Sequence, residues 1–571
     1  MSVFARPTRV SRATAAYNVH AYHTKVPPQA ISPYIEHYTQ RGGLVLDPFA
    51  GSGMTGLAAA LSGRRAILND LSPAAVHIAR NYTTPCDAEA LRVAADRLLG
   101  WSVPQVEPLY ETTCPRCEGR ATAEYVVWSD ERTCPRCGAA VLVWDSRLEG
   151  GNVGRLRCGT CGELFDKARA RVAGERAVLV NLACPECRVG RQEISPGPGD
   201  LTRMAFDRKD VPYWYPDLPF GSDWEMWRGG HRDLGIENVA DFWSPRNLAA
   251  LSVLFEGIRR EPDQRLREAL TWVFTAIVNR ASRRYQWNSK RPTNVLGGTL
   301  YIASLRYEWN VLSLFRRKLR AVLAFYRQTA LPAGAVTVIQ GSATHLATVA
   351  TSSVDYCFTD PPFGANIYYA DASLLWEAWL GQLTDRALEA VVSKKRAGKT
   401  VADYREVMGR SLAEVRRALK PDGMTTMVFQ NTDDAVWTAI RDAATDAGLH
   451  VVGASTLHKT QPSFKGIKAM QAGEHVAATD VVMTLSPSPR ARQGVTGRVD
   501  ADSIVSAAIE RDLLTSGSGR TREIGHLYAV AVSALLEAGT PTDGWTFDRV
   551  AEVASKVMSP DDGQLSLDMV D

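Results

Sequence analysis

The chain has 571 residues, too many for one ordinary compact core, and this length predicts roughly two to four domains. Its 66 Lys and Arg residues against 62 Asp and Glu residues give a net charge of +4, which does not by itself identify a partner. Apolar content of 45% is ordinary for a globular protein, and the lack of any apolar run of about 18 residues excludes a transmembrane helix.

The first 35 residues predict a short basic arm. They contain no acidic side chain and four basic ones: Arg6, Arg9, Arg12 and Lys25. An organellar transit peptide has a similar composition, but a motif described below already begins at His23, so we favour the arm. No apolar signal-peptide core follows the first residue, and we expect a cytoplasmic protein.

Residues 43–82 alternate between short apolar runs and a helical pattern. The run from Gly43 to Leu46 ends in Asp47, and a second run, 66–68, ends in Asp70, with an Ala- and Leu-rich helical pattern at 54–62 between them. This alternation predicts an α/β fold with a parallel sheet. The pattern returns later in the chain, with strands expected at 335–339, 354–358, 424–429, 450–454 and 479–485 and helices at 372–380 and 402–419.

We interpret the two α/β parts as halves of one core, 1–105 and 331–487, separated by a large insertion. The insertion divides into a turn-rich part that holds the Cys pairs, 106–195, and a largely helical part, 196–330. A linker containing Ser-Pro-Ser-Pro follows at 486–496. The remaining segment, 497–571, has a helical pattern and no chemical signature.

A Gly-rich turn, Asp47-Pro48-Phe49-Ala50-Gly51-Ser52-Gly53, joins the first strand to the first helix. Gly51 and Gly53 let the backbone approach a ligand, and the helix that follows presents free N–H groups suited to a carboxylate or phosphate. Asp70 ends the neighbouring strand, where a carboxylate can accept hydrogen bonds from both ribose hydroxyls of an adenosine. Gly51, Gly53 and Gly56 also satisfy the G-x-G-x-x-G pattern of dinucleotide-binding loops. The loop therefore predicts an adenosine-containing cofactor, but it does not distinguish a nicotinamide-dependent enzyme from a methyltransferase.

The tetrapeptide Asp360-Pro361-Pro362-Phe363 follows the apolar strand at 354–358, which would deliver it to the ligand-binding edge of the sheet. An exocyclic base amine is a poor nucleophile because its lone pair is delocalised into the ring. The Asp360 carboxylate and the Pro361 carbonyl can accept its hydrogens and free that lone pair. Pro361 and Pro362 hold these acceptors rigidly, and Phe363 offers a ring for stacking the base. Methyl transfer in line from a sulfonium needs no covalent intermediate, so positioning should supply up to roughly 7–11 kcal/mol of the acceleration.

Together these motifs resemble those of the DNA amino-methyltransferases, which use S-adenosylmethionine on a Rossmann-like sheet. The turn at 47–53 is similar to their cofactor motif and the tetrapeptide at 360–363 to their catalytic motif. The segment His23-Thr24-Lys25-Val26-Pro27-Pro28 resembles their N-terminal cofactor-proximal motif, with one extra residue before the proline, and this places Lys25 at the cofactor. The motif order is similar to the alpha arrangement, in which the insertion recognises the target.

A closer resemblance is to the adenine-specific DNA methylases that contain a zinc ribbon. It is carried by Phe-Thr-Asp-Pro-Pro-Phe-Gly-Ala-Asn-Ile-Tyr-Tyr-Ala-Asp at 358–371 and Leu-Trp-Glu-Ala-Trp-Leu at 375–380, and extends over about residues 18–485. It implies a prokaryotic enzyme that methylates adenine N6 of duplex DNA with the target base flipped out, and it raises restriction or phage-defence proteins as partners. Many members carry Gly-Asp-Ala before the catalytic strand; here the sequence is Gly341-Ser342-Ala343, and we expect Ser342 to contact the cofactor instead.

Eight of the ten Cys residues form four Cys-x-x-Cys pairs: Cys114/Cys117, Cys134/Cys137, Cys158/Cys161 and Cys184/Cys187. A chain without a secretion signal keeps its thiols reduced, so the pairs predict metal ligands rather than disulfides. Two structural Cys₄ zinc sites fit the ligand count. We favour pairing of sequence neighbours, the first pair with the second and the third with the fourth. A nested arrangement, with the two middle pairs together, is the alternative.

The stretch 280–327 contains eleven Lys or Arg residues and one acid, Glu308, with aromatic residues interleaved. Four of the basic residues cluster within nine positions: Arg283, Arg284, Lys290 and Arg291. Phosphate neutralisation next to aromatic faces predicts nucleic-acid binding. A solvated basic helix face with buried aromatic rings is the alternative.

Other functions stay open on the sequence alone. An RNA methyltransferase acting on a base amine such as guanine N2 uses a similar tetrapeptide, and a DNA cytosine-N4 methyltransferase differs little, although Asp at position 360 favours adenine. A zinc-dependent nucleic-acid-binding protein with an inactive core would not require intact Asp47, Gly51, Gly53 and Asp70. A nicotinamide oxidoreductase would leave the catalytic tetrapeptide and the Cys pairs unexplained.

Overall fold

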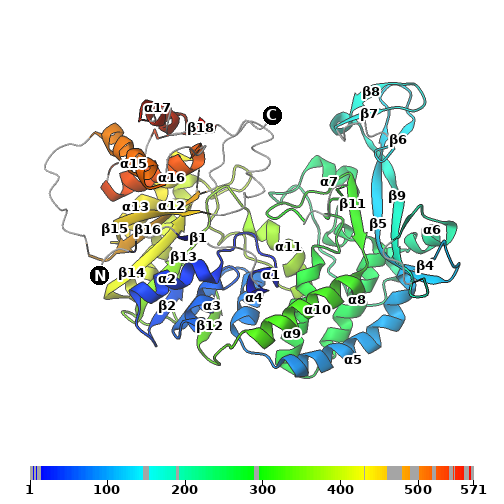
Figure 1. Ribbon diagram of the computed structural model, residues 1–571, viewed down its shortest axis with the longest axis horizontal. Coiled ribbons are helices and arrows are strands. Elements are labelled where there is room, and N and C mark those ends of the chain that lie inside the picture. The colour runs from blue at the N-terminus through cyan, green and yellow to red at the C-terminus, as the bar shows by residue number, and fades with distance from the viewer. Residues whose placement is uncertain are drawn as a thin grey trace.

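The computed structural model describes residues 4, 8–9, 15–145, 154–187, 192–288, 295–429, 431, 433–458, 479–488, 500–516, 522–538, 540, 544–545, 547–557 and 565–566. It consists of a sheet with its covering helices, joined to a second lobe made of a helical block and a long β-hairpin (Figure 1). Within these ranges, none of the helices combines the length and apolar character that a membrane span requires.

The large sheet has eight strands in the order β1-β15-β16-β14-β13-β2-β3-β12. Most neighbours pair in parallel, but β16 runs antiparallel to both β14 and β15. The α/β class is therefore confirmed, whereas the expectation of a parallel sheet is wrong at β16, which lies between β14 and β15 and makes the sheet a mixed one. The bounds are β1 (Thr8–Arg9), β2 (Leu44–Asp47), β3 (Arg65–Asp70), β12 (Val336–Gln340), β13 (Val354–Thr359), β14 (Leu419–Phe429), β15 (His450–His458) and β16 (Thr479–Ser486).

Strands from the beginning and the later part of the chain lie side by side in this sheet. β2 pairs in parallel with β13, with Tyr356 opposite Val45 and Cys357 opposite Leu46. Parallel neighbours end at the same edge, so this pairing brings the loops that follow β2, β3 and β13 together. The domain boundaries drawn from the sequence stay a prediction, but the two parts share one sheet.

Alternate residues of the strands face two separate layers of helices. Tyr356 and Phe358 pack with α2 (Pro28–Tyr38) and α3 (Met54–Leu61), whereas Cys357 packs with α12 (Val401–Ala418) and α13 (Asp434–Asp446). The C-terminal helices α15 (Ala501–Ser516), α16 (Ile524–Ala538) and α17 (Phe547–Val557) extend the second layer, because α16 contacts β15 and β16. A short pair, β17 (Arg522–Glu523) and β18 (Leu565–Ser566), lies beside them.

The helical block is fixed to the sheet through an aromatic core. Trp379 of α11 (Tyr369–Leu380) packs against Trp243, Phe255 and Phe274, with ring centroids 5.9, 5.3 and 5.0 Å away. The block contains α5 (Ala88–Val106), α8 (Pro245–Arg259), α9 (Gln264–Val278) and α10 (Val311–Gln328), and α4 (Pro73–Thr83) contacts α9 from the sheet side. Shorter elements are α1 (Ala15–Asn18), η1 (Glu107–Tyr110), η2 (Lys167–Arg169), α6 (Pro198–Met204), η3 (Arg208–Asp210), α7 (Gly229–Asp233) and η4 (Val239–Phe242).

The hairpin rises from the helical block as a long ribbon (Figure 1). Its strands, β5 (Arg120–Thr133) and β9 (Val172–Ala183), pair from Thr122↔Ala183 at one end to Arg132↔Val172 at the other. The smaller strands beside it are β4 (Glu111–Thr113), β6 (Ala140–Leu142), β10 (Gln192–Ile194) and β11 (Leu305–Trp309), and the tip carries β7 (Arg155–Arg157) paired with β8 (Leu164–Asp166).

Candidate active site and Cys₄ clusters

A cavity of about 700 Å³ lies where the loops after β2, β3, β12 and β13 meet. This volume includes the space at the open mouth of the cavity. Residues that the sequence assigned to two separate motifs line the same cavity: Pro48, Phe49, Gly51, Asp70 and Ser342 from the cofactor motif, and Asp360 and Pro362 from the catalytic motif. The structure therefore places both loops around one space.

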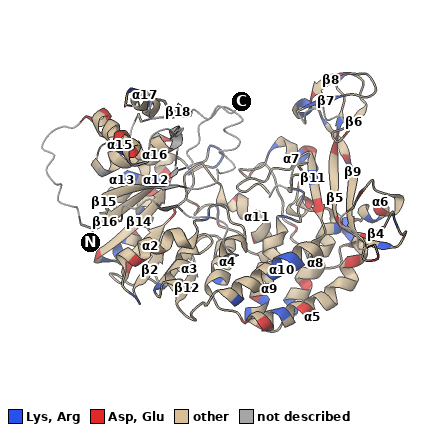
Figure 2. Ribbon diagram, in the orientation of Figure 1, with Lys and Arg blue, Asp and Glu red and all other residues tan. Residues whose placement is uncertain are grey.

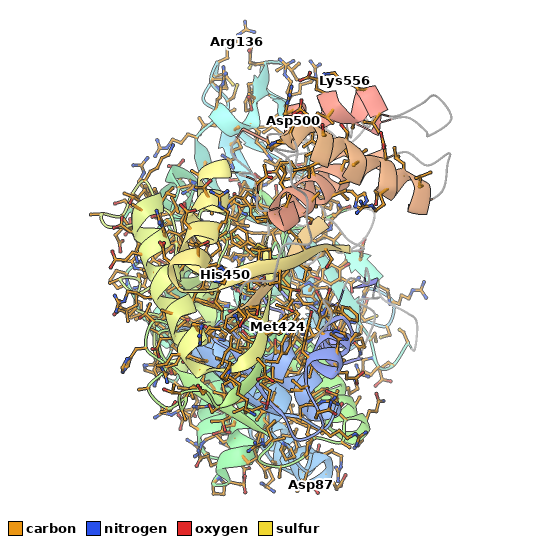
Figure 3. The ribbon with its side chains drawn as sticks, turned by 90° about the vertical axis from the view of Figure 1, so that its left-hand side faces the viewer. Asp87, Arg136, Met424, His450, Asp500 and Lys556 are labelled. Atoms are coloured by element: carbon orange, nitrogen blue, oxygen red, sulfur yellow. The ribbon has the colours of Figure 1, made fainter. Side chains whose placement is uncertain are left out.

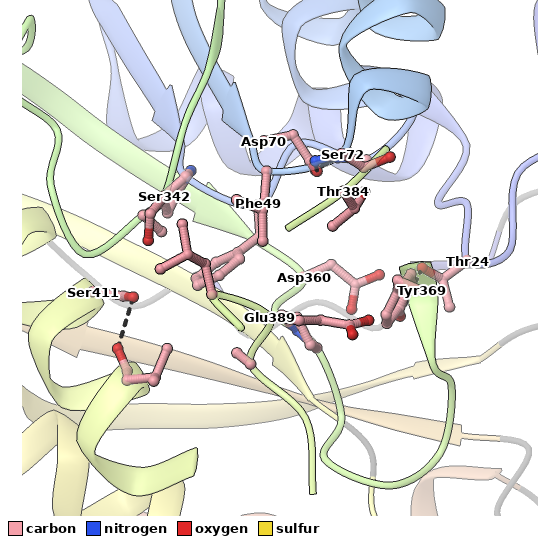
Figure 4. Close-up of a pocket in the computed structure, with 18 of the residues that line it drawn as sticks. Thr24, Phe49, Asp70, Ser72, Ser342, Asp360, Tyr369, Thr384, Glu389 and Ser411 are labelled. Carbon is pink, nitrogen blue, oxygen red and sulfur yellow. Dashed lines mark hydrogen bonds between the residues drawn. The ribbon is translucent and has the colours of Figure 1, made fainter. Parts of the chain in front are cut away.

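The labelled residues divide this cavity into two sides (Figure 4). Ser342 and Ser411 lie on one side, with the ring of Phe49 between them and the centre. Asp360 lies toward the other side, between Thr384 and Glu389 and next to Tyr369. An adenosine-sized ligand on the first side would thus have its far end directed toward Asp360.

The two glycines of the turn are required for different reasons. Gly51 has φ 50°, and a Cβ there would lie 2.8 Å from Cε1 of Tyr22, whose ring forms part of the cavity wall. Gly53 has φ 78°, and a Cβ there would lie 2.7 Å from Cβ of Ala79 on α4. Gly53 and the buried Ser52 therefore shape the turn without lining the cavity.

Asp47 supports the turn from below rather than lining the cavity. Its carboxylate accepts hydrogen bonds from Thr55 Oγ1 at 2.6 Å and from the Phe49 N–H at 3.1 Å. Burial raises the pKa of Asp47 to about 7, and these two hydrogen bonds oppose that rise. Asp47 thus holds Phe49 and the start of α3 in place without lining the cavity itself.

Asp70 lines the cavity directly. Its carboxylate accepts hydrogen bonds from the Gly51 N–H at 2.7 Å and from the Ser72 N–H at 2.9 Å, which fix its orientation. Burial raises the pKa of Asp70 to about 6, against the opposing effect of these N–H groups. The lone pairs that remain can accept hydrogen bonds from two ribose hydroxyls.

The affinity of the cavity for a ribose-containing ligand should therefore depend on pH. A ribose that donates two hydrogen bonds favours the carboxylate form of Asp70, so affinity should be constant well above pH 6 and fall by at most about tenfold per unit below it. Calorimetric titration of S-adenosylmethionine between pH 5 and 8 checks this. Asp70→Asn should bind more weakly and without that pH dependence; an identical pH profile in both proteins would assign the titration to another group.

The catalytic loop is held by hydrogen bonds to its own backbone. Tyr404 donates its hydroxyl to the Pro362 carbonyl at 2.7 Å, and Asn431 donates its amide to the Phe363 carbonyl at 2.9 Å. The Phe363 ring is buried and packs edge-on against Phe429, with centroids 5.4 Å apart. The stacking role expected of Phe363 has no support in this geometry, since Phe363 and Pro361 do not line the cavity and Tyr22 and Tyr369 do.

Lys25 lies outside the cavity, contrary to its expected place at the cofactor. Its ammonium donates to the carbonyls of Tyr17 at 2.7 Å and His20 at 3.2 Å and to the Tyr82 hydroxyl at 2.8 Å. Burial in this position lowers the pKa of Lys25. The same N-terminal motif still contributes to the site, because Thr24 and the preceding Tyr22 line the cavity.

A buried carboxylate, Glu377 on α11, links two neighbouring residues of the cavity wall, Ser72 and Thr384. It accepts hydrogen bonds from the Ser72 hydroxyl at 2.6 Å and from the Thr384 N–H at 2.7 Å. Ser72 caps α4 next to Asp70, and Thr384 lies above Asp360. Sequence reasoning did not select Glu377, Thr384, Tyr369 or Glu389, although Tyr369 and Glu377 fall in the stretches that carry the family resemblance.

The eight paired Cys residues form two clusters, each with all four sulfur atoms within 4.8 Å of one another. The closest sulfur contacts are 3.6 to 3.7 Å, which is too long for a disulfide. Tetrahedral zinc with Zn–S bonds of about 2.3 Å places its sulfurs about 3.8 Å apart, so both clusters fit a structural Zn²⁺. The clusters are Cys114, Cys117, Cys184 and Cys187 at the base of the hairpin, and Cys134, Cys137, Cys158 and Cys161 at its tip.

This grouping is nested, and the pairing of sequence neighbours that we favoured is wrong. The physical reason is the antiparallel hairpin, in which the start of β5 and the end of β9 lie at the same end. Cys114 and Cys117 precede β5 and therefore meet the pair that follows β9. The two middle pairs, after β5 and before β9, meet at the tip.

Two of the four basic residues selected for nucleic-acid contact are bound within the protein. Arg284 is buried and donates to Asn279 Oδ1 at 2.6 Å and to the Leu296 carbonyl at 2.9 Å. Arg283 pairs with Glu175 at 2.8 Å. The structure thus does not present these guanidinium groups to a phosphate, and the other two selected residues, Lys290 and Arg291, lie outside the described residues.

Comparison with known proteins bears on part of the chain. Residues 3–81 match a family model described as DNA methylase, N6_N4_Mtase, a range that includes the cofactor loop and Asp70 but not Asp360. The search of curated proteins gave no match. A segment is similar to the crystal structure of the antibiotic-resistance methyltransferase Kmr, at 14% identity over 28% of this chain and 63% of that chain with a TM-score of 0.15. The chain thus spans less than two thirds of that protein, and no argument rests on this likeness. The family match supports an amino-methyltransferase of the N6/N4 kind.

Proposed function

We propose that the chain is an S-adenosylmethionine-dependent methyltransferase that modifies an exocyclic base amine in DNA, with adenine N6 as its acceptor. The observation that carries the proposal is the single cavity lined by Asp70 and Phe49 on one hand and Asp360 on the other. The two motifs lie far apart in the sequence but line one space, as expected if a ligand at Asp70 reacts with a ligand at Asp360. The family match at residues 3–81 supports DNA as the substrate.

The cofactor side of the cavity fits an adenosine. Asp70 is oriented to accept the ribose hydroxyls, and the Ser342 hydroxyl, 2.9 Å from Thr344 Oγ1, lines the wall where an adenine amine can be met. The tight turn at Gly51 leaves no room for a Cβ beside Tyr22, as a close backbone approach requires. Bound S-adenosylmethionine supplies an activated methyl group on its sulfonium.

The chain's own residues position the acceptor amine. The Asp360 carboxylate, which lines the cavity, accepts a hydrogen of the amine, and the loop that carries it is held by Tyr404 and Asn431. The N–C bond forms as the S–C bond breaks, and the methylated amine then loses one proton, for which Asp360 is the assigned acceptor. Because the base must enter the cavity, it has to leave the duplex stack.

The identity of the labelled nucleoside tests this proposal. Unmethylated genomic DNA and total RNA are each incubated with the protein and S-adenosylmethionine carrying a labelled methyl group, then digested to nucleosides. We expect label in N6-methyldeoxyadenosine alone. Label in N4-methyldeoxycytidine would change the acceptor base, and label only in RNA, for example in N2-methylguanosine, would change the substrate. No transfer to either by a protein that binds the cofactor would contradict the proposal.

A further inference from the structure

The two Cys₄ clusters begin with the same tetrapeptide, Cys-Pro-Arg-Cys, at 114–117 and 134–137, yet they lie in different surroundings. The base cluster lies beside paired strands, because β4 pairs with β5 and β10 with β9, and α6 contacts β4 and η1. The tip cluster lies beyond Ser129, the last β5 residue that pairs with β11. The same local motif is therefore used once inside the lobe and once at its extremity.

The tip has a small core of its own. Val141, Val143, Leu156 and Phe165 pack around Cys134 and Cys158, and only Leu305 and Trp287 join them from the rest of the chain. This core and the four Cys ligands together explain how a unit of this size stays folded. The core around the base cluster is also small, but its residues Ala121, Leu182 and Ile194 belong to the paired strands β5, β9 and β10.

The two clusters also differ in the charge of the residues that surround them. The described tip residues, 133–145 and 154–172, contain six basic side chains, Arg136, Arg155, Arg157, Lys167, Arg169 and Arg171, against three acidic ones, Asp145, Glu163 and Asp166. Around the base cluster, residues 111–120 and 184–187 contain two basic side chains, Arg116 and Arg120, against three acidic ones, Glu111, Glu118 and Glu186. By this count the described tip residues are net positive and those around the base cluster are not. Lys and Arg residues are visible beside β7 at the tip (Figure 2).

The positive charge of the tip faces solvent. Arg136 is 67% exposed and Arg169 is 90% exposed, and their contacts with Glu163 and Asp166 are 3.8 and 4.0 Å long. Exposed pairs of this kind contribute little and leave the guanidinium groups able to rearrange. Arg155 and Arg157 are also exposed. Arginine presents a planar fork that matches phosphate oxygens.

The hairpin carries this charge away from the rest of the lobe. β5 has 14 residues, and at about 3.3 Å per residue it spans about 45 Å. Seen from the side, Arg136 lies at one extreme of the molecule and Asp87, at the start of α5, at the other (Figure 3). A positive module at the end of an arm of this length suits a long polyanion better than a compact ligand.

We propose that the tip, residues 133–145 and 154–172, binds the sugar–phosphate backbone of duplex DNA outside the base pairs that flank the target, whereas the base cluster is a structural brace. This inference rests on the proposed function for its choice of duplex DNA. It adds a surface and a division of roles between the two Cys₄ clusters that the sequence motifs alone did not distinguish.

The inference is tested by measuring binding to a random duplex of about 40 base pairs. Fluorescence anisotropy gives Kd at each of a range of salt concentrations. Neutralising Arg136, Arg155 and Arg157 together with Gln should raise Kd roughly tenfold at physiological salt and reduce the slope of log Kd against log salt by about 3. Arg136→Gln alone should reduce the slope by about 1, while Arg116→Gln, the matched position at the base, should leave it unchanged.

Zinc content and the thermal unfolding midpoint of each variant, both expected to equal those of the wild type, show that the tip remains folded. An unchanged Kd and slope in the triple variant, as a tip that binds a protein partner would give, overturns the inference. Equal effects of Arg136→Gln and Arg116→Gln overturn it as well. The binding readout does not depend on methyl transfer, so failure of the inference is distinguishable from failure of the proposed function.

Discussion

Replacing Asp360 with Ala should reduce kcat for methyl transfer by roughly 10²–10⁴-fold, because it removes the acceptor that frees the lone pair of the amine. S-adenosylmethionine should bind the variant with nearly wild-type affinity, since Asp70, Phe49 and Ser342 are unchanged. Single-turnover transfer to unmethylated genomic DNA and calorimetric cofactor binding, measured on the same preparation, check both parts.

Asp422→Ala is a suitable control, because Asp422 is an exposed carboxylate on β14 that does not line the cavity. It should transfer methyl groups at the wild-type rate. Loss of cofactor binding together with activity in Asp360→Ala would indicate a collapsed cavity rather than a lost acceptor. Full activity of Asp360→Ala would contradict the role given to the catalytic loop.

Zinc stoichiometry should distinguish the nested clusters from neighbour pairing. The purified protein should hold two zinc ions per chain. Cys137→Ser/Cys161→Ser alters one cluster only and should retain one zinc, whereas Cys117→Ser/Cys137→Ser alters both clusters and should retain none. Neighbour pairing predicts the opposite result for the two variants, so metal analysis after gel filtration decides between them.

A variant that loses the tip zinc, Cys137→Ser/Cys161→Ser, should differ in stability from one that loses the base zinc. Structural zinc contributes on the order of 10 kcal/mol to the folding of small domains, so losing a site is a large effect. Loss at the tip should unfold mainly the small core around Val143 and Leu156. Loss at the base, tested with Cys117→Ser/Cys187→Ser, should lower the unfolding midpoint of the whole lobe, because this cluster packs against Ala121, Leu182 and Ile194 of three paired strands. Equal midpoints for the tip and base variants would contradict this difference.

The α/β core and both ligand loops were predictable because local signals specify them. Each strand that carries a loop is a short apolar run, and two of them end in Asp47 and Asp70, next to a Gly-rich turn or a capped helix. The resulting strands and helices lie within a few residues of their predicted positions. The antiparallel course of β16 carries no comparable local signal, since it depends on which strands it lies between.

The errors arose where distant segments decide the outcome. The spacing of the Cys pairs is compatible with two arrangements, and the register of β5 with β9 selects one of them. Arg283 is withdrawn from solvent by Glu175, which lies 108 residues away, and Phe363 by Phe429 on a neighbouring strand. In the same way, Lys25 is held by Tyr82 on α4, a partner that no motif records.

The most direct test of the account is an experimental structure of the full chain with S-adenosylhomocysteine, the demethylated form of the cofactor. The account predicts that the ribose contacts Asp70, that the adenine lies toward Ser342, and that the sulfur faces Asp360 within the one cavity. A ligand bound elsewhere, or in this cavity with its sulfur directed away from Asp360, would contradict the claim that the two loops serve one reaction.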